Sequence, residues 1–279
     1  MNEVEALRES VRGLLGKPDA WERLRDEVGV TGLLVPERFG GAGAGMAEAC
    51  VVLEELGRVL SPAPMLQTVI ATQALLGAGD ERHLPAIAQG TLTPTLAWEG
   101  YVLPGDLILA LVDGKLIEVD ERPEPLPTMD ETRPLARLSR PLGEVTPNAF
   151  VALAAEQVGA MTRALEITVE YARTRVQFGR TIGSFQALQH RMADLFVLVE
   201  TSRSAYLAAV AGTLDPRVAK VHCSEAFQKV AAEMIQIHGG IGITWEHDAH
   251  RYFKRAHSSA MLFGHPRTHV AQLAKQVLD

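Results

Sequence analysis

Two long stretches of helical periodicity flank one short segment, and they limit the fold more than any other feature of this chain. Apolar side chains repeat every three or four residues from Val158 to Ala172, and again from Phe185 to Val199. This spacing places them along one face of an α-helix. Gly179 and Gly183 interrupt the pattern between the two stretches. The sequence therefore predicts two long helices with buried faces, joined by a short irregular connection.

The connection between these helices carries residues suited to an anion. Arg173 and Arg175 fall in the last turns of the first helix, Arg180 follows Gly179, and Ser184 can act as the N-cap of the second helix. An arginine at a helix end can donate two hydrogen bonds from its guanidinium to a phosphate, and the flexible backbone at a nearby glycine can donate more from its free amides. Alternatively, the arginines form a solvated face that complements the helix dipole.

A glycine pair ends another apolar helix further along the chain. The segment is Gln236-Ile-His-Gly-Gly-Ile-Gly242, in which Gly239 and Gly240 predict a helix stop that exposes backbone to a ligand. Together with Tyr171–Asp194, this segment resembles the C-terminal helical domain of acyl-CoA dehydrogenases. Residues 32–41, followed by Val52-Leu-Glu-Glu-Leu-Gly57, resemble the N-terminal helical domain of the same family.

This resemblance covers most of the chain and implies an FAD flavoprotein with a mainly α fold. We expect an N-terminal helical domain over residues 1–92, a strongly shortened β region with a proline-rich connector over residues 93–146, and a C-terminal four-helix bundle over residues 147–279. In the family the glycine loop near residues 40–45 helps to frame the acyl pocket, although glycine serves plain turn geometry equally well.

Local patterns predict the individual elements. Helices are expected at residues 4–15, 21–28, 46–60, 66–76, 148–174, 184–211, 215–238 and 248–277, the last interrupted around Gly264-His-Pro266. Strands are expected at residues 93–98, 107–112 and 115–119, with Asp113-Gly114 as a hairpin turn. Four prolines make residues 121–146 an extended connector rather than regular structure.

Composition limits the function further. The formal net charge of −7 argues against a general nucleic-acid or membrane-surface role. Cys50 and Cys223 lie in separate apolar helical patterns, without the paired spacing of a zinc site or a disulfide framework. The N-terminus has no apolar core of signal-peptide length, and no later apolar run reaches the length of a membrane span. We expect buried reduced thiols, no membrane or nucleic-acid partner, and a cytoplasmic location.

The resemblance implies proton removal by a carboxylate, yet the usual position of that base is occupied here by Phe263. An alternative position in the family corresponds to Ala149 and Phe150, which are not carboxylates either. Glu156 lies two helical turns beyond Ala149 on the same face and is the candidate catalytic base. A carboxylate in an apolar helix has a raised pKa unless it is paired, and a cation such as Arg191 would make Glu156 structural instead.

The resemblance also implies cofactor-binding residues. Arg175, Gln177, Phe178 and Gln186, with Gln236, Gly239 and Gly240, match positions that reach the FAD of a neighbouring subunit. The family's threonine-glutamate-proline segment, which contacts the flavin ring, is replaced by Ala97-Trp-Glu-Gly100. His265 and His269 are one helical turn apart but lack a third ligand, so surface histidines and no metal are expected.

Three hypotheses follow from these residues. The chain could be a self-sufficient acyl-CoA dehydrogenase, a flavin-binding subunit without its own base, or a scaffold that binds neither flavin nor acyl-CoA. Retention of the nucleotide motifs favours the first two, and loss of the base and of much of the β domain favours the last two. We expect an oligomer, either a homodimer or a complex with a full-length acyl-CoA dehydrogenase-like partner subunit, acting on an acyl-CoA.

Overall fold

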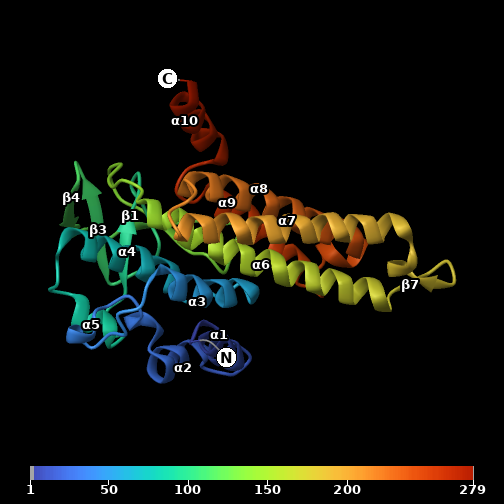
Figure 1. Cartoon of the computed structure of the whole chain (residues 1–279), viewed down its shortest axis with the longest axis horizontal. Coiled ribbons are helices and arrows are strands. Elements are labelled where there is room, and N and C mark those ends of the chain that lie inside the picture. The colour runs from blue at the N-terminus through green and yellow to red at the C-terminus, as the bar shows by residue number, and fades with distance from the viewer. Residues whose placement is uncertain (1–2, 279) are drawn as a thin grey trace.

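The computed structural model describes residues 3–278 and places a small β region and a layer of short helices beside one end of a long helical bundle (Figure 1). The N-terminal elements are α1 (Glu3–Leu15), α2 (Ala20–Arg23), η1 (Leu24–Val28), η2 (Val30–Gly32), η3 (Glu37–Phe39), α3 (Met46–Arg58), α4 (Met65–Ala78) and α5 (Leu84–Ala88). The predicted helix at 21–28 is thus continuous but changes to a wider π-helical turn, which ends at Gly29 in the left-handed conformation. Helix α5 was not predicted.

The β region forms two small sheets instead of one sheet and a connector. In the first sheet, β1 (Pro94–Ala97) pairs in parallel with β3 (Leu107–Val112), which forms a hairpin with β4 (Lys115–Glu118). Asp113 and Gly114 both have positive φ, at 50° and 72°, as a type I′ hairpin turn requires. The second sheet has the order β2 (Tyr101–Val102), β6 (Leu135–Arg137), β5 (Glu124–Leu126).

The second sheet corrects the prediction for residues 121–146, since β5 and β6 both lie in that segment. Pro125 sits in β5 opposite Ala136. Strand β5 is an edge strand of its sheet, so a proline there need not remove a hydrogen bond between strands. A run of prolines therefore did not exclude regular structure.

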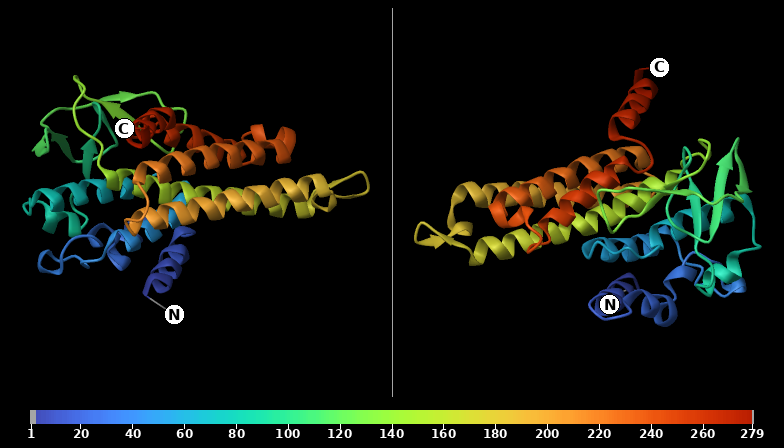
Figure 2. Two further views of the ribbon diagram at one scale, coloured as in Figure 1. Left: turned by 45° about the horizontal axis from the view of Figure 1, so that its top comes forward. Right: turned by 180° about the vertical axis from the view of Figure 1, so that it is seen from behind.

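The bundle consists of α6 (Pro147–Thr174), α7 (Gln186–Val210), α8 (Pro216–His238) and α9 (Ala249–Met261). The predicted last helix is divided, because Phe263 and Gly264 have φ values of 59° and 99° and end α9. The chain continues as α10 (Pro266–Leu278), which projects away from the bundle (Figures 1 and 2). Pro216 occupies the first turn of α8, directly after the Asp215 N-cap.

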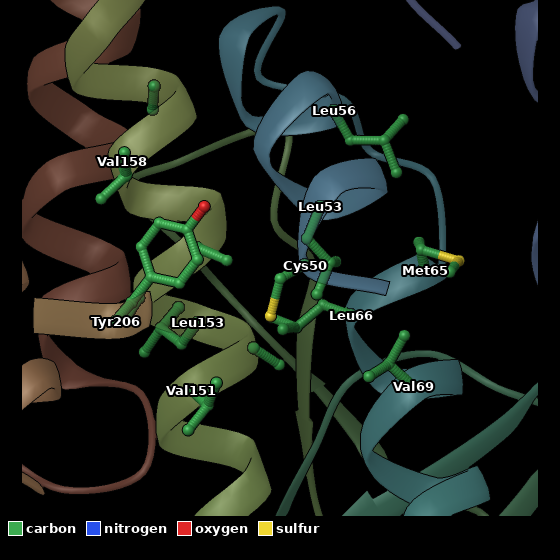
Figure 3. Packing of buried hydrophobic residues seen from close by; sticks show 14 of the residues in the cluster. Cys50, Leu53, Leu56, Met65, Leu66, Val69, Val151, Leu153, Val158 and Tyr206 are labelled. Carbon is green, nitrogen blue, oxygen red and sulfur yellow. The ribbon is translucent and has the colours of Figure 1, made fainter. Parts of the chain in front are cut away.

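Two glycines allow α3 to lie directly against α6. A Cβ at Gly57 would be 2.9 Å from the Glu156 carbonyl carbon, and one at Gly159 would be 2.6 Å from the Glu54 carbonyl carbon. Around this crossing, apolar side chains of α3, α4 and α6 face one another and meet Tyr206 of α7 (Figure 3). The main core therefore joins the N-terminal helices to the bundle. Both cysteines are buried and unpaired, as predicted, and burial raises the pKa of each thiol to about 12.

Candidate functional site

The segment between α6 and α7 folds into a hairpin that projects from the far end of the bundle (Figures 1 and 2). Its strands are β7 (Val176–Gln177) and β8 (Arg180–Thr181). Phe178 and Gly179 form the turn with φ values of 54° and 76°, and the Phe178 side chain is 91% exposed. Because a bulky residue seldom adopts positive φ, the turn holds an aromatic ring in solvent at a conformational cost.

Residues beside the hairpin leave polar side chains exposed. Arg175 ends α6: its amide donates to the Tyr171 carbonyl, and its own carbonyl accepts from Ile182. Gln177 in β7 and Gln186 at the start of α7 are exposed. The N-cap prediction for Ser184 is wrong, because its hydroxyl donates to the Thr181 carbonyl and α7 begins two residues later.

The glycine turn that follows α8 is equally open. Helix α8 ends at His238, and Gly239 then adopts a φ of 64° at the start of η5 (Gly239–Ile243). A Cβ placed on Gly239 or Gly240 would meet no atom within 4 Å, so the outer side of this turn faces open space. The Gln236 side chain is exposed one turn earlier.

The structure brings these two segments together. Ala172, Ile182 and Ile237 form a buried apolar cluster that joins the end of α6, the hairpin region and the end of α8. Arg173, Arg175 and Arg180 are exposed and form no ion pair with any described residue. The Arg180 guanidinium instead lies 3.9 Å from the centre of the Phe185 ring. Exposed cations, a tight hairpin and a glycine turn thus converge on one end, which suits a phosphate-bearing ligand.

A second region surrounds Phe263, at the other end of the bundle. The Phe263 ring is 3% exposed and meets the Trp98 ring edge to face, with the ring centres 4.8 Å apart. His269 donates from Nε2 to the Phe263 carbonyl at 2.9 Å. Lys220 Nζ donates to the carbonyls of Ala260 and Gly264 at 2.7 and 2.6 Å, and burial lowers the pKa of Lys220 to about 8. The Phe263 turn is therefore held from three sides.

Two cavities border the contact between Trp98 and Phe263. One, of about 620 Å³, is lined by Phe150, Phe263 and His269, and the other, of about 730 Å³, by Trp98, Met129 and Met261. Both are of the size of ligand pockets. Glu99 lines both cavities. It has a φ of 48° in a tight turn that joins Trp98 to Tyr101.

Glu99 was not predicted as a site residue, although it lies within the Ala97–Gly100 segment that the sequence singled out. A glutamate directly before a glycine was the available signal. What could not be read from the sequence is the turn, which places the side chain between two cavities.

Glu156, the predicted base, is buried among cations. Its Oε1 accepts from the guanidinium of Arg133 and from Arg255 Nη1, the latter at 2.7 Å. Arg191, the partner considered from the sequence, pairs with Glu233 instead. Glu156 lines neither of the two cavities beside Phe263. This geometry favours the structural interpretation, and catalysis by Glu156 stays a prediction.

The histidine prediction holds for one residue and fails for the other. His265 is exposed, but His269 is 5% exposed because its ring packs against Phe150 and hydrogen-bonds the Phe263 carbonyl. Among residues 3–278, no three His, Cys, Asp or Glu side chains are grouped as a metal would require. Nor is any described helix long and apolar enough to cross a membrane.

Comparison with known proteins agrees with this architecture. The family models described as "Acyl-CoA dehydrogenase, N-terminal domain" and "Acyl-CoA dehydrogenase, C-terminal domain" match residues 2–91 and 149–278. "Acyl-CoA dehydrogenase IpdE2" of Mycolicibacterium smegmatis is 43% identical over 98% of this chain and 93% of its own length. The chain belongs to the acyl-CoA dehydrogenase family. The protein of the same name from Mycobacterium tuberculosis is 45% identical over 93% of this chain and 86% of its own.

Solved acyl-CoA dehydrogenase structures share the fold over the whole chain. The "Tcur3481-Tcur3483 steroid ACAD G363A variant" has a TM-score of 0.86 at 25% identity, covering 99% of this chain and 98% of that one. The ChsE4-ChsE5 complex from Mycobacterium tuberculosis gives a TM-score of 0.85 at 24% identity, covering 100% and 98%. The predicted family and the mainly α architecture are thus confirmed. Members of the family are FAD-dependent flavoproteins.

Proposed function

We propose that this chain is a partner-dependent subunit of an FAD-dependent acyl-CoA dehydrogenase. In this proposal it supplies the nucleotide-binding end to a flavin that is shared with its partner, and it lacks a complete reaction centre of its own. The observation that carries the proposal is the direct contact between the rings of Trp98 and Phe263. Dehydrogenation requires a base, an acyl thioester and a flavin ring close together, and the touching rings of Trp98 and Phe263 leave no room for that arrangement between them.

The region of Trp98 and Phe263 does not fit a flavin ring. Trp98 belongs to the segment that replaces the family's ring-contacting residues, and Phe263 occupies the usual position of the base. Their centres are 4.8 Å apart, so neither a flavin ring nor a thioester can lie between them. In this proposal Glu156 does not take over the role of the missing base, because it is paired with Arg133 and Arg255.

The far end of the bundle does fit the nucleotide part of FAD. The Arg175 guanidinium forms no ion pair with any residue from 3 to 278, and Gly239 and Gly240 leave their outer surface free for close approach. Gln177, Gln186 and Gln236 add exposed amide donors, and Phe178 adds an exposed ring. These groups would hold the diphosphate and the adenosine, whereas the flavin ring, which accepts the hydride when bound, would extend into the partner subunit.

Exposed apolar side chains support an oligomer. On α7, the exposed fractions are 57% for both Phe196 and Val197 and 47% for Leu207. At the nucleotide-binding end, Ile243 and Trp245 are 72% and 70% exposed. Apolar surface of this extent is typical of protein interfaces. Relatives named as a steroid acyl-CoA dehydrogenase and as a ChsE4-ChsE5 complex favour a heteromer and a bulky acyl-CoA substrate.

The proposal is tested by co-expressing the chain with candidate full-length family members and measuring the flavin absorbance of the purified complex. Arg175→Ala should weaken FAD binding in that complex, because it removes a charged donor. Arg38→Ala is the matched control, since Arg38 is also exposed but lies in the N-terminal helices and pairs with Glu81. Unchanged FAD binding in Arg175→Ala would contradict the assignment.

Catalysis is tested separately by anaerobic flavin bleaching with a panel of acyl-CoA thioesters. The complex should bleach and the chain alone should not. Rapid bleaching by the chain alone that disappears in Glu156→Gln would instead make Glu156 a base and the chain a self-sufficient enzyme. A complex without flavin would favour the scaffold hypothesis.

A further inference from the structure

Three aromatic side chains lie beneath the glycine turn at the far end of the bundle. Tyr171 comes from the end of α6, His238 is the last residue of α8, and His247 follows η5. The Tyr171 and His238 rings are stacked with centres 4.3 Å apart and planes at 23°. The His247 ring lies 4.3 Å from that of His238 and 6.4 Å from that of Tyr171. We call these three residues the ring cluster.

The ring cluster contacts both nucleotide motifs through the backbone. Tyr171 donates from its hydroxyl to the His238 carbonyl at 3.3 Å, directly before Gly239. The Tyr171 carbonyl in turn accepts from the Arg175 amide at 2.9 Å, at the base of the hairpin. One residue, Tyr171, thus contacts both segments, with its hydroxyl before Gly239 and with its backbone carbonyl at Arg175.

The His238 ring has few alternative positions. It is 3% exposed, and its Nδ1 lies 2.7 Å from the Met234 carbonyl oxygen. A Cβ on Gly242 would be 3.1 Å from the His238 Cβ, so η5 packs closely on this residue. The position of the glycine turn therefore depends on the stack beneath it.

We propose that Tyr171 and His238 are positioning residues for the dinucleotide, which fix the glycine turn and the hairpin at the separation that one ligand must bridge. This inference rests on the proposed function of the far end of the bundle. The hydrogen bonds that connect Tyr171 to the two motifs involve the backbone of His238 and of Arg175, so the ring cluster acts by ordering the backbone. Its contribution comes from ring stacking and therefore depends on aromatic character at both positions.

The test compares aromatic with aliphatic replacements in the co-expressed complex. Tyr171→Phe and His238→Phe keep a stacked pair, whereas Tyr171→Leu and His238→Leu remove it. The leucine variants should raise the FAD dissociation constant by about threefold to tenfold, the range expected from one lost aromatic pair. The phenylalanine variants should stay within about twofold of wild type. His222→Leu, earlier on α8, is the control histidine and should change nothing.

A second measurement does not depend on flavin. Hydrogen exchange of the flavin-free complex should be faster at residues 239–243 in the leucine variants and unchanged in the phenylalanine variants. If a leucine variant does not fold, His247→Leu removes a partly exposed member of the cluster and should show a smaller rise in the same exchange rates.

The outcomes separate the two proposals. If Arg175→Ala weakens FAD binding and the leucine variants do not, the positioning role is refuted and the nucleotide site stands. Equal losses in leucine and phenylalanine variants would also refute it, because stacking would not be the cause. If Arg175→Ala has no effect, the proposed function fails, whatever the exchange rates are.

Discussion

Arg255 is the residue whose loss should destabilise this fold most clearly, because it connects α9 to three other regions of the chain. The residue is 1% exposed, and its guanidinium donates to Asp130 Oδ2 at 2.6 Å and to Glu156 Oε1 at 2.7 Å. Its Nη2 also donates to the Leu60 carbonyl and to the Thr132 hydroxyl. The β region, the end of α3, α6 and α9 thus meet at one guanidinium.

Replacing Arg255 with methionine should cost about 3–5 kcal/mol of unfolding free energy, since it leaves Asp130 as a buried charge without its partner. Glu156 would keep Arg133, so the loss should not exceed that range. This loss is a large fraction of the total unfolding free energy of a typical protein, which is about 5–15 kcal/mol. With a slope of about 3 kcal/mol/M for a chain of this size, the urea midpoint should fall by about 1–2 M.

The assay is urea unfolding followed by circular dichroism, with Arg251→Ala as the control. Arg251 lies on the same helix, but its side chain is 55% exposed, so its loss should stay within about 0.5 kcal/mol. A loss below about 1 kcal/mol in Arg255→Met would refute the reasoning, because it would mean that Asp130 does not depend on this partner.

The pH dependence gives an independent check. Burial alone would raise the pKa of Asp130, but the Arg255 charge and the Thr132 hydrogen bonds outweigh it and hold that pKa below the ordinary value of 3.8. The resulting stabilisation is fully present above pH 3.8 and is lost as the pH falls through the lower folded-state pKa. The deficit of Arg255→Met should therefore shrink in acid, and a deficit that is constant with pH would contradict this explanation.

Three further predictions follow from single residues. Gly159→Ala should lower the unfolding free energy by about 1–3 kcal/mol, because the new Cβ would collide with the Glu54 backbone. Gly77→Ala on α4 is the control and should not lower it, since a Cβ there meets no atom within 4 Å. Urea unfolding measures both values. Burial lowers the pKa of Lys220 from 10.5 to about 8 in the folded state, so the unfolded chain binds more protons between these two pH values. The unfolding free energy of the wild type should therefore rise relative to that of Lys220→Met as the pH increases from about 8 to 10.5. A difference in unfolding free energy that does not change with pH would contradict this prediction. Phe263→Glu should leave the chain alone unable to bleach flavin in anaerobic assays, because Trp98 still occupies the space beside the new carboxylate.

Helical periodicity predicted most of the architecture because it reports local burial. The bundle helices α6, α7 and α8 lie within two residues of their predicted bounds, and Asp113-Gly114 forms the expected hairpin turn. Errors came where tertiary contacts decide the local structure. Ser184 has the right chemistry for an N-cap, but the Thr181 carbonyl takes its hydroxyl. The short strands β5 and β6 exist because each pairs with a neighbour, which periodicity does not report.

The candidate site residues also differ in whether local sequence or tertiary contacts decide their role. Arg175, Gln177, Gln236 and Gly239 lie in continuous segments whose composition already indicated a ligand, so the sequence could single them out. The contact between Trp98 and Phe263 joins residues far apart in the chain, and no local pattern could show that the two rings meet. The same holds for Glu156, whose partners come from the β region and from α9. The sequence could thus show that the usual base is missing. Only the fold shows that the Trp98 and Phe263 rings lie against each other at that position. The filled position makes a partner subunit the more economical explanation for the retained nucleotide motifs.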